Sequence, residues 1–542
     1  MTVYGGWIIG FALIYTALLV VAGQLARRRT SKAGGYFVGG RSFNKWIVCF
    51  CITGLFSGST FIAVLEMAYL KGVSAIWYGV AETLQILIIA FLIIGPFRKK
   101  MVVTVSGLIG DKYGRSAKAL AGAITAFAFP MWSVATAIAF ASALHVFTGF
   151  SLSLSVAFTA ILLFAYLQAG GMWSIAFTQS MNAIVFVIMF AIGVIAFFIN
   201  PGIDGLKEMA AARPEMFEWG NAGLQVIVAW FGTFFVNVIL AQAAFQMALS
   251  CKTPEEGQKG LKLAAIFGIP FTVLAILFGL SAAAVIPEGK LGLLALPQYL
   301  AQVLPAPLVG LFFLGIWACA LGWGAPCQFS GATSLGRDTG GAIFPSADEK
   351  RLVTYTKWSL LILTGLMVLF GLLRTEQSAW WNIMAWTIRN SATFAPVVAA
   401  LFWPQVTRPA VLSSLAAGFV SGLGWYWLGG WDVSKFYLNV HPVWVGMSVN
   451  VVTIVAVTLL STAGSFRIRK FAEAPVHYFS LAAGILLFVI NGLNFAALHD
   501  KGLTGLIVFT ALIGIFIAII GIVRAAGKPV PGATETEAVA AV

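Results

Sequence analysis

Three ionisable side chains lie inside otherwise apolar segments of the sequence: Glu66, Glu82 and Arg389. A charge in the hydrocarbon core of a membrane is costly unless it is paired or hydrated, so such residues often mark a working site. The planar guanidinium of Arg389 suits a substrate carboxylate, which it can bind through two parallel hydrogen bonds. The same arginine could instead be neutralised by Glu66 or Glu82 and simply fix helix packing. Both interpretations are open on the residues alone.

The other reactive side chains do not form a catalytic or metal-binding pattern. The sequence has no HExxH motif and no apparent nucleophile–base pair within an apolar segment, which argues against an enzyme. The five cysteines show no CxxC spacing, so neither a disulfide framework nor a metal site is indicated. The four histidines fall near segment ends or in loops, which makes them weak candidates for a proton relay. We therefore expect no cofactor.

The elements that carry these residues are long apolar segments. The chain has 542 residues, of which 60% are hydrophobic and only 10% are charged. A run of about twenty apolar residues is enough to cross a membrane as a helix. The sequence predicts fifteen spans, near 5–25, 46–70, 74–97, 119–147, 150–169, 172–199, 222–248, 260–286, 306–335, 353–373, 382–403, 410–428, 443–463, 478–497 and 503–523. We therefore predict an all-α polytopic protein of the cell membrane, embedded in the lipid bilayer.

The net charge of +14 is a topology signal and does not indicate nucleic acid as a partner. Most of the 33 Lys and Arg residues fall in alternate loops, for example in Arg27–Arg29, Arg98–Lys100 and Arg467–Lys470. Because basic residues concentrate in cytoplasmic loops, this distribution predicts an N-terminus outside and a C-terminus in the cytoplasm. The Ala-, Pro-, Gly- and Thr-rich tail at 527–542 is expected to be disordered.

Two predicted spans contain polar interruptions where a helix could break. The second span carries Ser57, Gly58, Ser59 and Thr60 halfway along, and the seventh carries Gly232-Thr233 followed by Asn237. Broken helices expose backbone carbonyl and N–H groups at the middle of the membrane, where transporters bind their substrates. Equivalent points of these spans are five helices apart, the spacing of two five-helix inverted repeats. Alternatively, the small residues only permit close helix packing.

Several segments together resemble the sodium:solute symporter family. They are YFVGGRSFNKW, GGMWSIAFTQSMNAIVFVIMF, LPAPLVGLFFLGIWACA with SGATSLGRD, and APVVAALFW, between Tyr36 and Trp403. The resemblance implies a LeuT-type fold, with a five-plus-five inverted repeat and extra helices at both ends. The expected divisions are an N-terminal helix and loop at 1–45, a transport core at 46–403, accessory helices at 404–526 and the tail.

The resemblance also places a sodium site between the first and eighth core helices, and this sequence departs from it. Thr53 and Phe56 fall at the positions whose carbonyls would contact the ion. Gly322 and Trp323 stand where the family has two hydroxyl residues, and Gln179 stands where it has aspartate. A hard cation prefers oxygen ligands, which these side chains do not supply in the family's manner. We therefore expect sodium coupling to be absent or weakened, with Na+ and H+ both open as coupling ion.

The indole of Trp323 could fill the volume that the ion would occupy. Its N–H then needs an acceptor, for which a carbonyl of the first core helix is a candidate. Ser330 and Thr333, further along the same helix, are alternative oxygen ligands.

The resemblance implies a substrate cavity lined here by Thr60, Glu82, Phe234, Asn237, Ile388 and Arg389. An arginine there favours a small carboxylate-bearing solute, such as an amino acid or organic acid, moved by alternating access. Phe234 and Ile388 replace polar positions of sugar-transporting members, which disfavours a sugar. The rival hypothesis is a membrane sensor that acts with a separate signalling partner.

Overall fold

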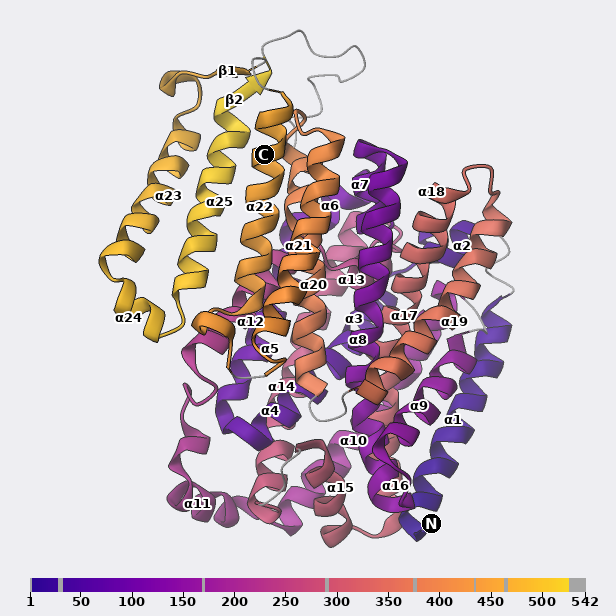
Figure 1. Cartoon of the computed structure of the whole chain (residues 1–542). Coiled ribbons are helices and arrows are strands. Elements are labelled where there is room, and N and C mark those ends of the chain that lie inside the picture. The colour runs from indigo at the N-terminus through magenta and orange to yellow at the C-terminus, as the bar shows by residue number, and fades with distance from the viewer. Residues whose placement is uncertain are drawn as a thin grey trace. The chain divides into compact units, whose positions relative to one another are not determined.

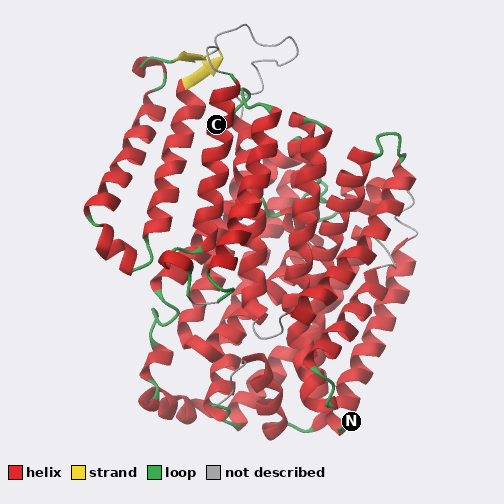
Figure 2. Ribbon diagram, viewed as in Figure 1, coloured by secondary structure: helices red, strands yellow, loops and turns green. Residues whose placement is uncertain are grey.

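The computed structural model describes residues 2–27, 33–167, 171–287, 292–373, 378–432, 435–462 and 466–525. Nearly all of them are helical, and one short antiparallel pair of strands joins two segments near the C-terminal end (Figure 2). The predicted disordered tail at 527–542 lies outside the described residues. The all-α fold agrees with the sequence prediction.

Contacts divide the chain into two compact units. Unit 1 comprises Met1–Thr104, Thr125–Gly223 and Ala241–Ala385, and unit 2 comprises Val105–Ile124, Leu224–Leu240 and Trp386–Val542. Each unit therefore combines three segments that are distant in sequence. This division differs from the expected linear one, in which residues 46–403 form a single core.

Unit 1 contains the following helices: α1 (Val3–Arg27), α2 (Ala33–Val38), α3 (Lys45–Phe56), α4 (Ala63–Lys71), α5 (Ile76–Ile88), α6 (Ile94–Lys99), most of α8 (Arg115–Thr148), α9 (Leu152–Leu167), α10 (Met172–Ile199), α11 (Gly202–Ala212), α13 (Gln242–Ala248), α14 (Pro254–Val285), α15 (Gly292–Val303), α16 (Ala306–Cys319), α17 (Ala325–Ala332), α18 (Gly341–Ile343) and α19 (Glu349–Leu373).

Unit 2 contains α7 (Val105–Tyr113), α12 (Leu224–Asn237), most of α20 (Ser378–Phe402), α21 (Arg408–Leu428), α22 (Pro442–Ser461), α23 (Pro475–Leu493), α24 (Phe495–Asp500), α25 (Thr504–Ile522), and the strands β1 (Phe466–Ile468) and β2 (Val523–Ala525). Within it, α23 and α25 lie side by side and β1 pairs with β2 at one end of them (Figure 1).

Short turns of other helical types interrupt or connect the α-helices of both units. The wider π-helical turns are η2 (Ser57–Ile62), η4 (Ile89–Ile93), η6 (Ala320–Gly324) and η7 (Thr333–Gly340). The tighter 3-10 turns are η1 (Gly39–Arg41), η3 (Gly72–Ala75), η5 (Pro214–Phe217), η8 (Tyr437–Asn439) and η9 (Phe471–Glu473).

The predicted membrane spans all fall on these helices. Among the described residues, eleven helical stretches are long and apolar enough to cross a membrane, or up to twelve if the bent pair α12–α13 is one span. One stretch, Lys45–Lys99, is 55 residues long and covers two of the predicted spans. The number of fifteen spans stays a prediction.

The second predicted span departs from α-helical geometry at the expected place, but it does not unwind. Ser57 to Ile62 form the π-helical turn η2 between α3 and α4. The Ser57 hydroxyl donates to the carbonyl of Gly54 at 2.6 Å, and the Ser59 hydroxyl oxygen lies 2.9 Å from the carbonyl oxygen of Leu55. These contacts remain within the helix, so the backbone continues through the polar stretch.

The break in the seventh predicted span lies later than the sequence predicts. Gly232 and Thr233 are inside α12, and the chain bends by 45° between Asn237 and Gln242. A Cβ atom on Gly232 would lie 2.0 Å from the indole of Trp444, so this glycine admits a neighbouring helix. The expected break at Gly232-Thr233 is therefore wrong, and close packing is the role of that glycine.

In α20, a proline explains a polar contact in the core of unit 2. Pro396 has no N–H, so it cannot donate to the carbonyl of Ala392 one turn earlier. Asn450 of α22 supplies that donor at 2.9 Å, and its Oδ1 accepts from the N–H of Ala395 at 2.8 Å. One buried amide thus satisfies two backbone groups and ties α20 to α22.

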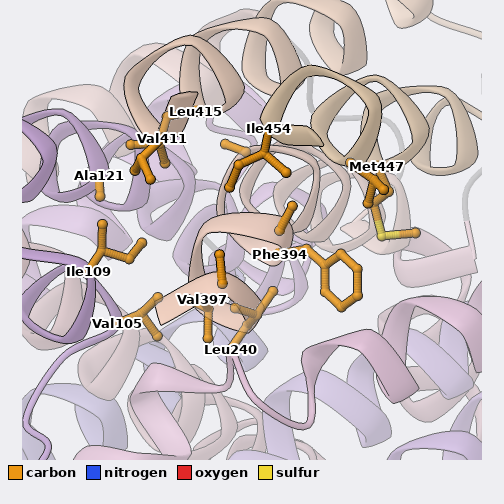
Figure 3. Close-up of a cluster of buried hydrophobic side chains, with 14 of the residues drawn as sticks. Val105, Ile109, Ala121, Leu240, Phe394, Val397, Val411, Leu415, Met447 and Ile454 are labelled. Atoms are coloured by element: carbon orange, nitrogen blue, oxygen red, sulfur yellow. The ribbon is translucent and has the colours of Figure 1, made fainter. Parts of the chain in front are cut away.

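The apolar core of unit 2 surrounds this contact. It combines side chains from α7, α20, α21 and α22, including Ile109, Val397, Val411 and Ile454 (Figure 3). All four are fully buried or nearly so. This packing fixes the C-terminal half of α20, the helix that also carries Arg389.

Candidate functional site

In unit 1, two of the predicted substrate residues are in direct contact. Glu82 of α5 accepts hydrogen bonds from the hydroxyls of Ser59, at 2.5 Å, and of Thr60. Both hydroxyls project from the π-helical turn η2, and all three side chains are buried. Such turns often occur at functional sites because they present side chains at angles that an α-helix does not allow. The carboxylate of Glu82 therefore lies where the helix is locally widened.

In unit 2, the other predicted substrate residues form a second cluster. The Nη2 atom of Arg389 donates to Asn237 Oδ1 and lies 3.4 Å from Asn390 Oδ1. The Asn390 amide donates to the carbonyl of Thr233 at 3.3 Å. The guanidinium thus lies against the last turn of α12, just before the chain bends. A buried cation at a helix end, where carbonyl groups lack intrahelical donors, is electrostatically favoured.

Aromatic packing accompanies this cluster. The rings of Phe234 and Trp386 lie edge to face, with centroids 4.6 Å apart. Ile388, beside Arg389, is fully buried. Phe234 and Ile388 are thus buried apolar side chains on the two helices that carry Asn237 and Arg389.

Glu66, the third ionisable side chain, holds the beginning of α20. Its carboxylate accepts from the Ser378 hydroxyl at 2.8 Å and from the N–H groups of Ser378 and Ala379 at 3.3 and 2.8 Å. The first N–H groups of a helix have no intrahelical acceptor, and a carboxylate there is stabilising. The described contacts of Glu66 thus favour a structural role.

The predicted altered ion site contains a hydrogen bond donated by a neutral side chain. Gln179 of α10 donates through Nε2 to the carbonyl of Gly322, in η6, at 2.6 Å. Asn182, one turn further, donates to Gln179 Oε1 at 3.4 Å and to the carbonyl of Ala318 at 3.1 Å. The Tyr15 hydroxyl donates to Asn182 Oδ1 at 2.7 Å. Hydrogen bonds between neutral side chains therefore connect Tyr15 of α1, through Asn182 and Gln179 of α10, to the backbone of η6.

One glycine makes room for the Gln179 amide, and another makes room for the Ser57 hydroxyl. A Cβ atom on Gly54 would lie 2.0 Å from Gln179 Oε1, and one on Gly322 would lie 2.5 Å from the Ser57 hydroxyl. Thr53 and Phe56, whose carbonyls were expected to face the ion, lie in the continuous helix α3. Gly54 is thus the residue that admits the Gln179 amide, and Gly322 admits the Ser57 hydroxyl.

Trp323 packs against its neighbours but does not make the expected hydrogen bond. A Cβ atom added to Gly58 would lie only 2.2 Å from the Cβ atom of Trp323. The Trp323 ring packs edge to face on Trp132, with ring centroids 6.0 Å apart. The indole Nε1 has no acceptor among the described residues. The expectation that it donates to a carbonyl of the first core helix is wrong, because the close approach of Gly58 fixes the side chain in a packing contact.

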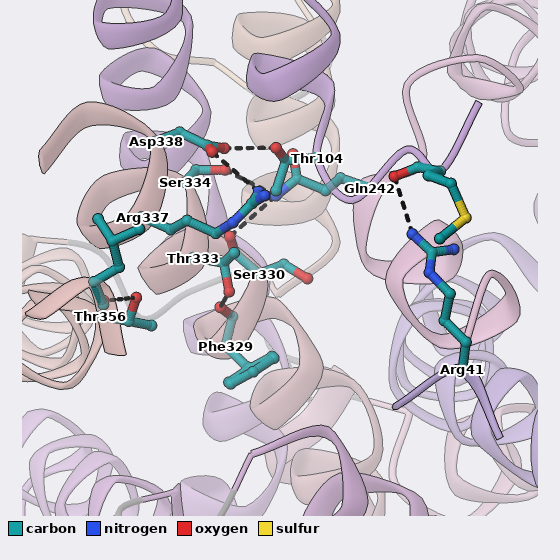
Figure 4. A network of polar contacts seen from close by, with 12 residues as sticks. Arg41, Thr104, Gln242, Phe329, Ser330, Thr333, Ser334, Arg337, Asp338 and Thr356 are labelled. Carbon is teal, nitrogen blue, oxygen red and sulfur yellow. Dashed lines mark hydrogen bonds and ion pairs between the residues drawn. The ribbon is translucent and has the colours of Figure 1, made fainter. Parts of the chain in front are cut away.

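The alternative oxygen ligands are engaged in hydrogen bonds of the protein itself (Figure 4). The Thr333 hydroxyl donates to the carbonyl of Phe329 at 2.8 Å, and the Ser330 hydroxyl donates to Gln246 Oε1. Gln242 donates to the Ser330 carbonyl at 3.0 Å and to the Ser334 hydroxyl at 2.8 Å. Among the described residues, no group of three or more His, Cys, Asp or Glu residues could hold a metal ion.

One histidine, His441, has a defined role at the beginning of α22. Its Nδ1 accepts from the N–H of Val443 at 3.2 Å, so it caps the helix in its neutral form. Burial lowers the pKa of His441 from 6.5 to about 3. It is therefore uncharged at neutral pH.

Sequence reasoning missed Asn382, a buried residue of α20. Neither its Nδ2 nor its Oδ1 has a hydrogen-bond partner within the described part of the chain. No charge or motif distinguishes it in the sequence.

Comparisons with known proteins give a consistent result. A family model described as the sodium:solute symporter family matches residues 36–418. The chain is 22% identical to an uncharacterized symporter, YidK, of Escherichia coli over 79% of this chain and 80% of that protein. It is 19% identical to a monocarboxylic acid transporter of Corynebacterium glutamicum over 73% of this chain and 79% of that protein.

A solved structure of a substrate-bound, outward-open Na+-coupled sialic acid symporter is similar in fold. The TM-score is 0.66 at 15% identity, and the match covers 84% of this chain and 98% of that chain. At this identity the likeness concerns the fold alone.

Proposed function

Because the chain belongs to the sodium:solute symporter family and is thus a secondary solute transporter, we propose that it carries a small carboxylate-bearing solute without using sodium at the altered site. The observation that carries the proposal is the 2.6 Å hydrogen bond from Gln179 to the Gly322 carbonyl. The family resemblance assigns these two positions to the sodium site.

The ion-coupling part of the proposal follows from the chemistry of the amide. A sodium ion needs several oxygen ligands, whereas the Gln179 Nε2 group is a donor and presents hydrogen atoms to the carbonyl. It satisfies that carbonyl without a cation. Ser57 likewise directs its hydroxyl to a carbonyl of its own helix. A cation at this place would have to displace the amide and replace its hydrogen bonds.

The substrate part rests on Arg389 and Asn237. A buried guanidinium binds a carboxylate through charge-assisted hydrogen bonds, and the Asn237 amide already holds one of its nitrogen atoms in place. The relative from Corynebacterium glutamicum is named for monocarboxylic acids, which supports this solute class. Within unit 1, the carboxylate of Glu82, with its hydroxyl donors Ser59 and Thr60, suits a cationic group.

Counterflow in proteoliposomes tests the transport of a carboxylate. Vesicles are loaded with one unlabelled acid from a panel of monocarboxylates and amino acids, and entry of the same labelled acid is followed. We expect transient accumulation of at least one acid, since counterflow needs no ion gradient. A membrane sensor would give none, and accumulation confined to compounds without a carboxylate would contradict the assignment of Arg389.

Thermal unfolding of the purified protein tests the ion site. Midpoints are compared in NaCl and KCl at equal ionic strength. A ligand that binds only the folded protein raises its unfolding midpoint, and the rise grows with ligand concentration. If sodium does not bind, we expect equal midpoints in the two salts. A rise specific to sodium and saturating with its concentration would contradict the proposal.

A further inference from the structure

Within unit 1, the turn η4 and the helix α6 pack against the first part of α14, and positive charge gathers along this contact. We call residues 91–100 and 252–266 the basic seam. The basic seam contains six basic and two acidic side chains, which gives a net charge of +4. The basic residues are Arg98, Lys99, Lys100, Lys252, Lys259 and Lys262, and the acidic residues are Glu255 and Glu256.

Contacts in the basic seam hold the two helix ends together without neutralising this charge. Arg98 Nε donates to the carbonyl of Cys251 at 3.2 Å, which fixes the end of α6 at the beginning of α14. Lys99 and Lys259, one from each helix, interact electrostatically with the same carboxylate, that of Glu255. The described part of the chain provides no ion pair for any of the six basic side chains. The excess positive charge is therefore open to a partner outside the chain.

Lys262 marks the level at which α14 enters the membrane. It is the last charged residue of this helix, since residues 263–285 carry no charge. Its ammonium group lies 4.2 Å from the ring centroid of Phe91, which is a cation–π contact. Phe91 and Leu92 of η4 are exposed, and so is Ile266, one turn after Lys262. Exposed apolar side chains in a membrane span face the acyl chains, and a lysine beside them places its charge at the level of the headgroups.

We propose that the basic seam binds an anionic phospholipid, whose phosphate group contacts Lys262 and whose acyl chain lies along Phe91 and Ile266. An ammonium group has three donors, and that of Lys262 has no hydrogen-bond acceptor among the described residues. A phosphate oxygen supplies an acceptor at this level. The other basic side chains attract a negative headgroup over about 10 Å, which favours an anionic lipid over a zwitterionic one. Lipid binding at this place does not depend on which solute the protein transports.

Thermal unfolding of the purified protein in mixed detergent–lipid micelles tests the proposal. The probes are dioleoyl phosphatidylglycerol, which is anionic, and dioleoyl phosphatidylcholine, which is zwitterionic and has the same acyl chains. A lipid that binds the folded protein raises the unfolding midpoint. We expect the rise to reach its half-maximum at a concentration about tenfold lower for phosphatidylglycerol than for phosphatidylcholine. Equal concentrations would contradict the proposal, and an equal rise with inorganic phosphate would show a site for free phosphate instead of a lipid.

Variants separate this site from a general attraction to charged micelles. Lys262→Gln should weaken the binding of phosphatidylglycerol about fivefold, whereas Lys262→Arg keeps the charge and should keep the preference. Lys357→Gln is the matched control, because Lys357 is also partly exposed and lies eight residues after the first residue of α19, as Lys262 does in α14. Residues 348–351, at the beginning of α19, comprise two acids and two bases, so this variant should bind as the wild type does. An equal loss in both glutamine variants, or no loss in Lys262→Gln, would overturn the site.

Discussion

The side-chain amide of Gln179 occupies the space that a Cβ atom on Gly54 would need, so Gly54 is the residue that admits it. Gly322 instead makes room for the Ser57 hydroxyl, which a Cβ there would approach to 2.5 Å. The sequence indicates the change at 179, but not which residue accommodates it. That relation depends on which side chain α10 directs toward η6, and only the structure shows it.

Gly54→Ala tests this packing. Its Cβ would lie 2.0 Å from Gln179 Oε1, so the amide must move and its hydrogen bond to Gly322 is strained. We expect a loss of about 1–3 kcal/mol of stability, seen as a lower unfolding midpoint. Gly424→Ala is the control, because a Cβ there meets no atom within 4 Å. In the Gln179→Ala background the cost of Gly54→Ala should shrink; an undiminished cost would show that the amide is not the obstacle.

Arg389→Ala tests the substrate assignment. The variant removes the guanidinium that is expected to bind the carboxylate, so counterflow of the transported acid should fall at least tenfold. Arg389→Lys should recover little, because an ammonium group lacks the planar pair of donors. Arg408→Ala serves as the control, since Arg408 is an exposed arginine that donates to Ser116. Unchanged transport in Arg389→Ala with normal membrane insertion would refute the role.

Among the elements, the helices themselves were predictable and their irregularities were only partly so. Apolar segment length located the spans, because each segment is long enough to bury its backbone hydrogen bonds as a helix. The π-helical turn at Ser57–Ile62 falls at the predicted interruption. The bend after Asn237 was misplaced because a glycine that breaks a helix and one that admits a neighbour look alike in sequence. Trp444, more than two hundred residues away, decides the role of Gly232.

Glu66→Gln tests the cap on α20. A neutral amide keeps one acceptor oxygen but loses the charge that favours the helix N-terminus, where Ser378 and Ala379 donate. We expect a destabilisation of roughly 1–2 kcal/mol, measured as a lower unfolding midpoint. Glu349→Gln, in the exposed first turn of α19, should have a smaller effect. Equal effects would mean that burial of Glu66 adds nothing to the cap.

The buried His441, which caps α22, should make the stability of the protein depend on pH. Burial holds its pKa at about 3, below 6.5, so the unfolded chain binds the proton more readily. The contribution of neutral His441 to the free energy of unfolding is therefore fully present above pH 6.5 and is lost as the pH falls toward 3. The loss is roughly 2 kcal/mol at pH 5. His441→Asn keeps a capping acceptor and should flatten the fall in unfolding midpoint between pH 6.5 and 5. An unchanged slope would contradict the assignment.

At the scale of the whole molecule, the membrane class and the fold were predictable, and the division into units was not. Composition and the family motifs indicate a LeuT-type transporter. Each unit, however, is built from segments far apart in the chain, and α12 belongs to a different unit from α13. The family pattern placed Thr60, Glu82, Asn237 and Arg389 in one predicted cavity; in the structure Thr60 contacts Glu82, and Arg389 contacts Asn237. Asn382 was missed because an isolated asparagine in a helix gives no signal until its partners are known to be missing.

The dependence of transport on sodium tests the central claim most directly. The initial rate of uptake of the transported carboxylate into proteoliposomes is measured from zero to 100 mM external sodium, with potassium holding the ionic strength constant. The rate is expected to change by less than about twofold, because the Gln179 amide already satisfies the Gly322 carbonyl at the predicted ion site. A strong, saturable rise of the rate with sodium would contradict this account.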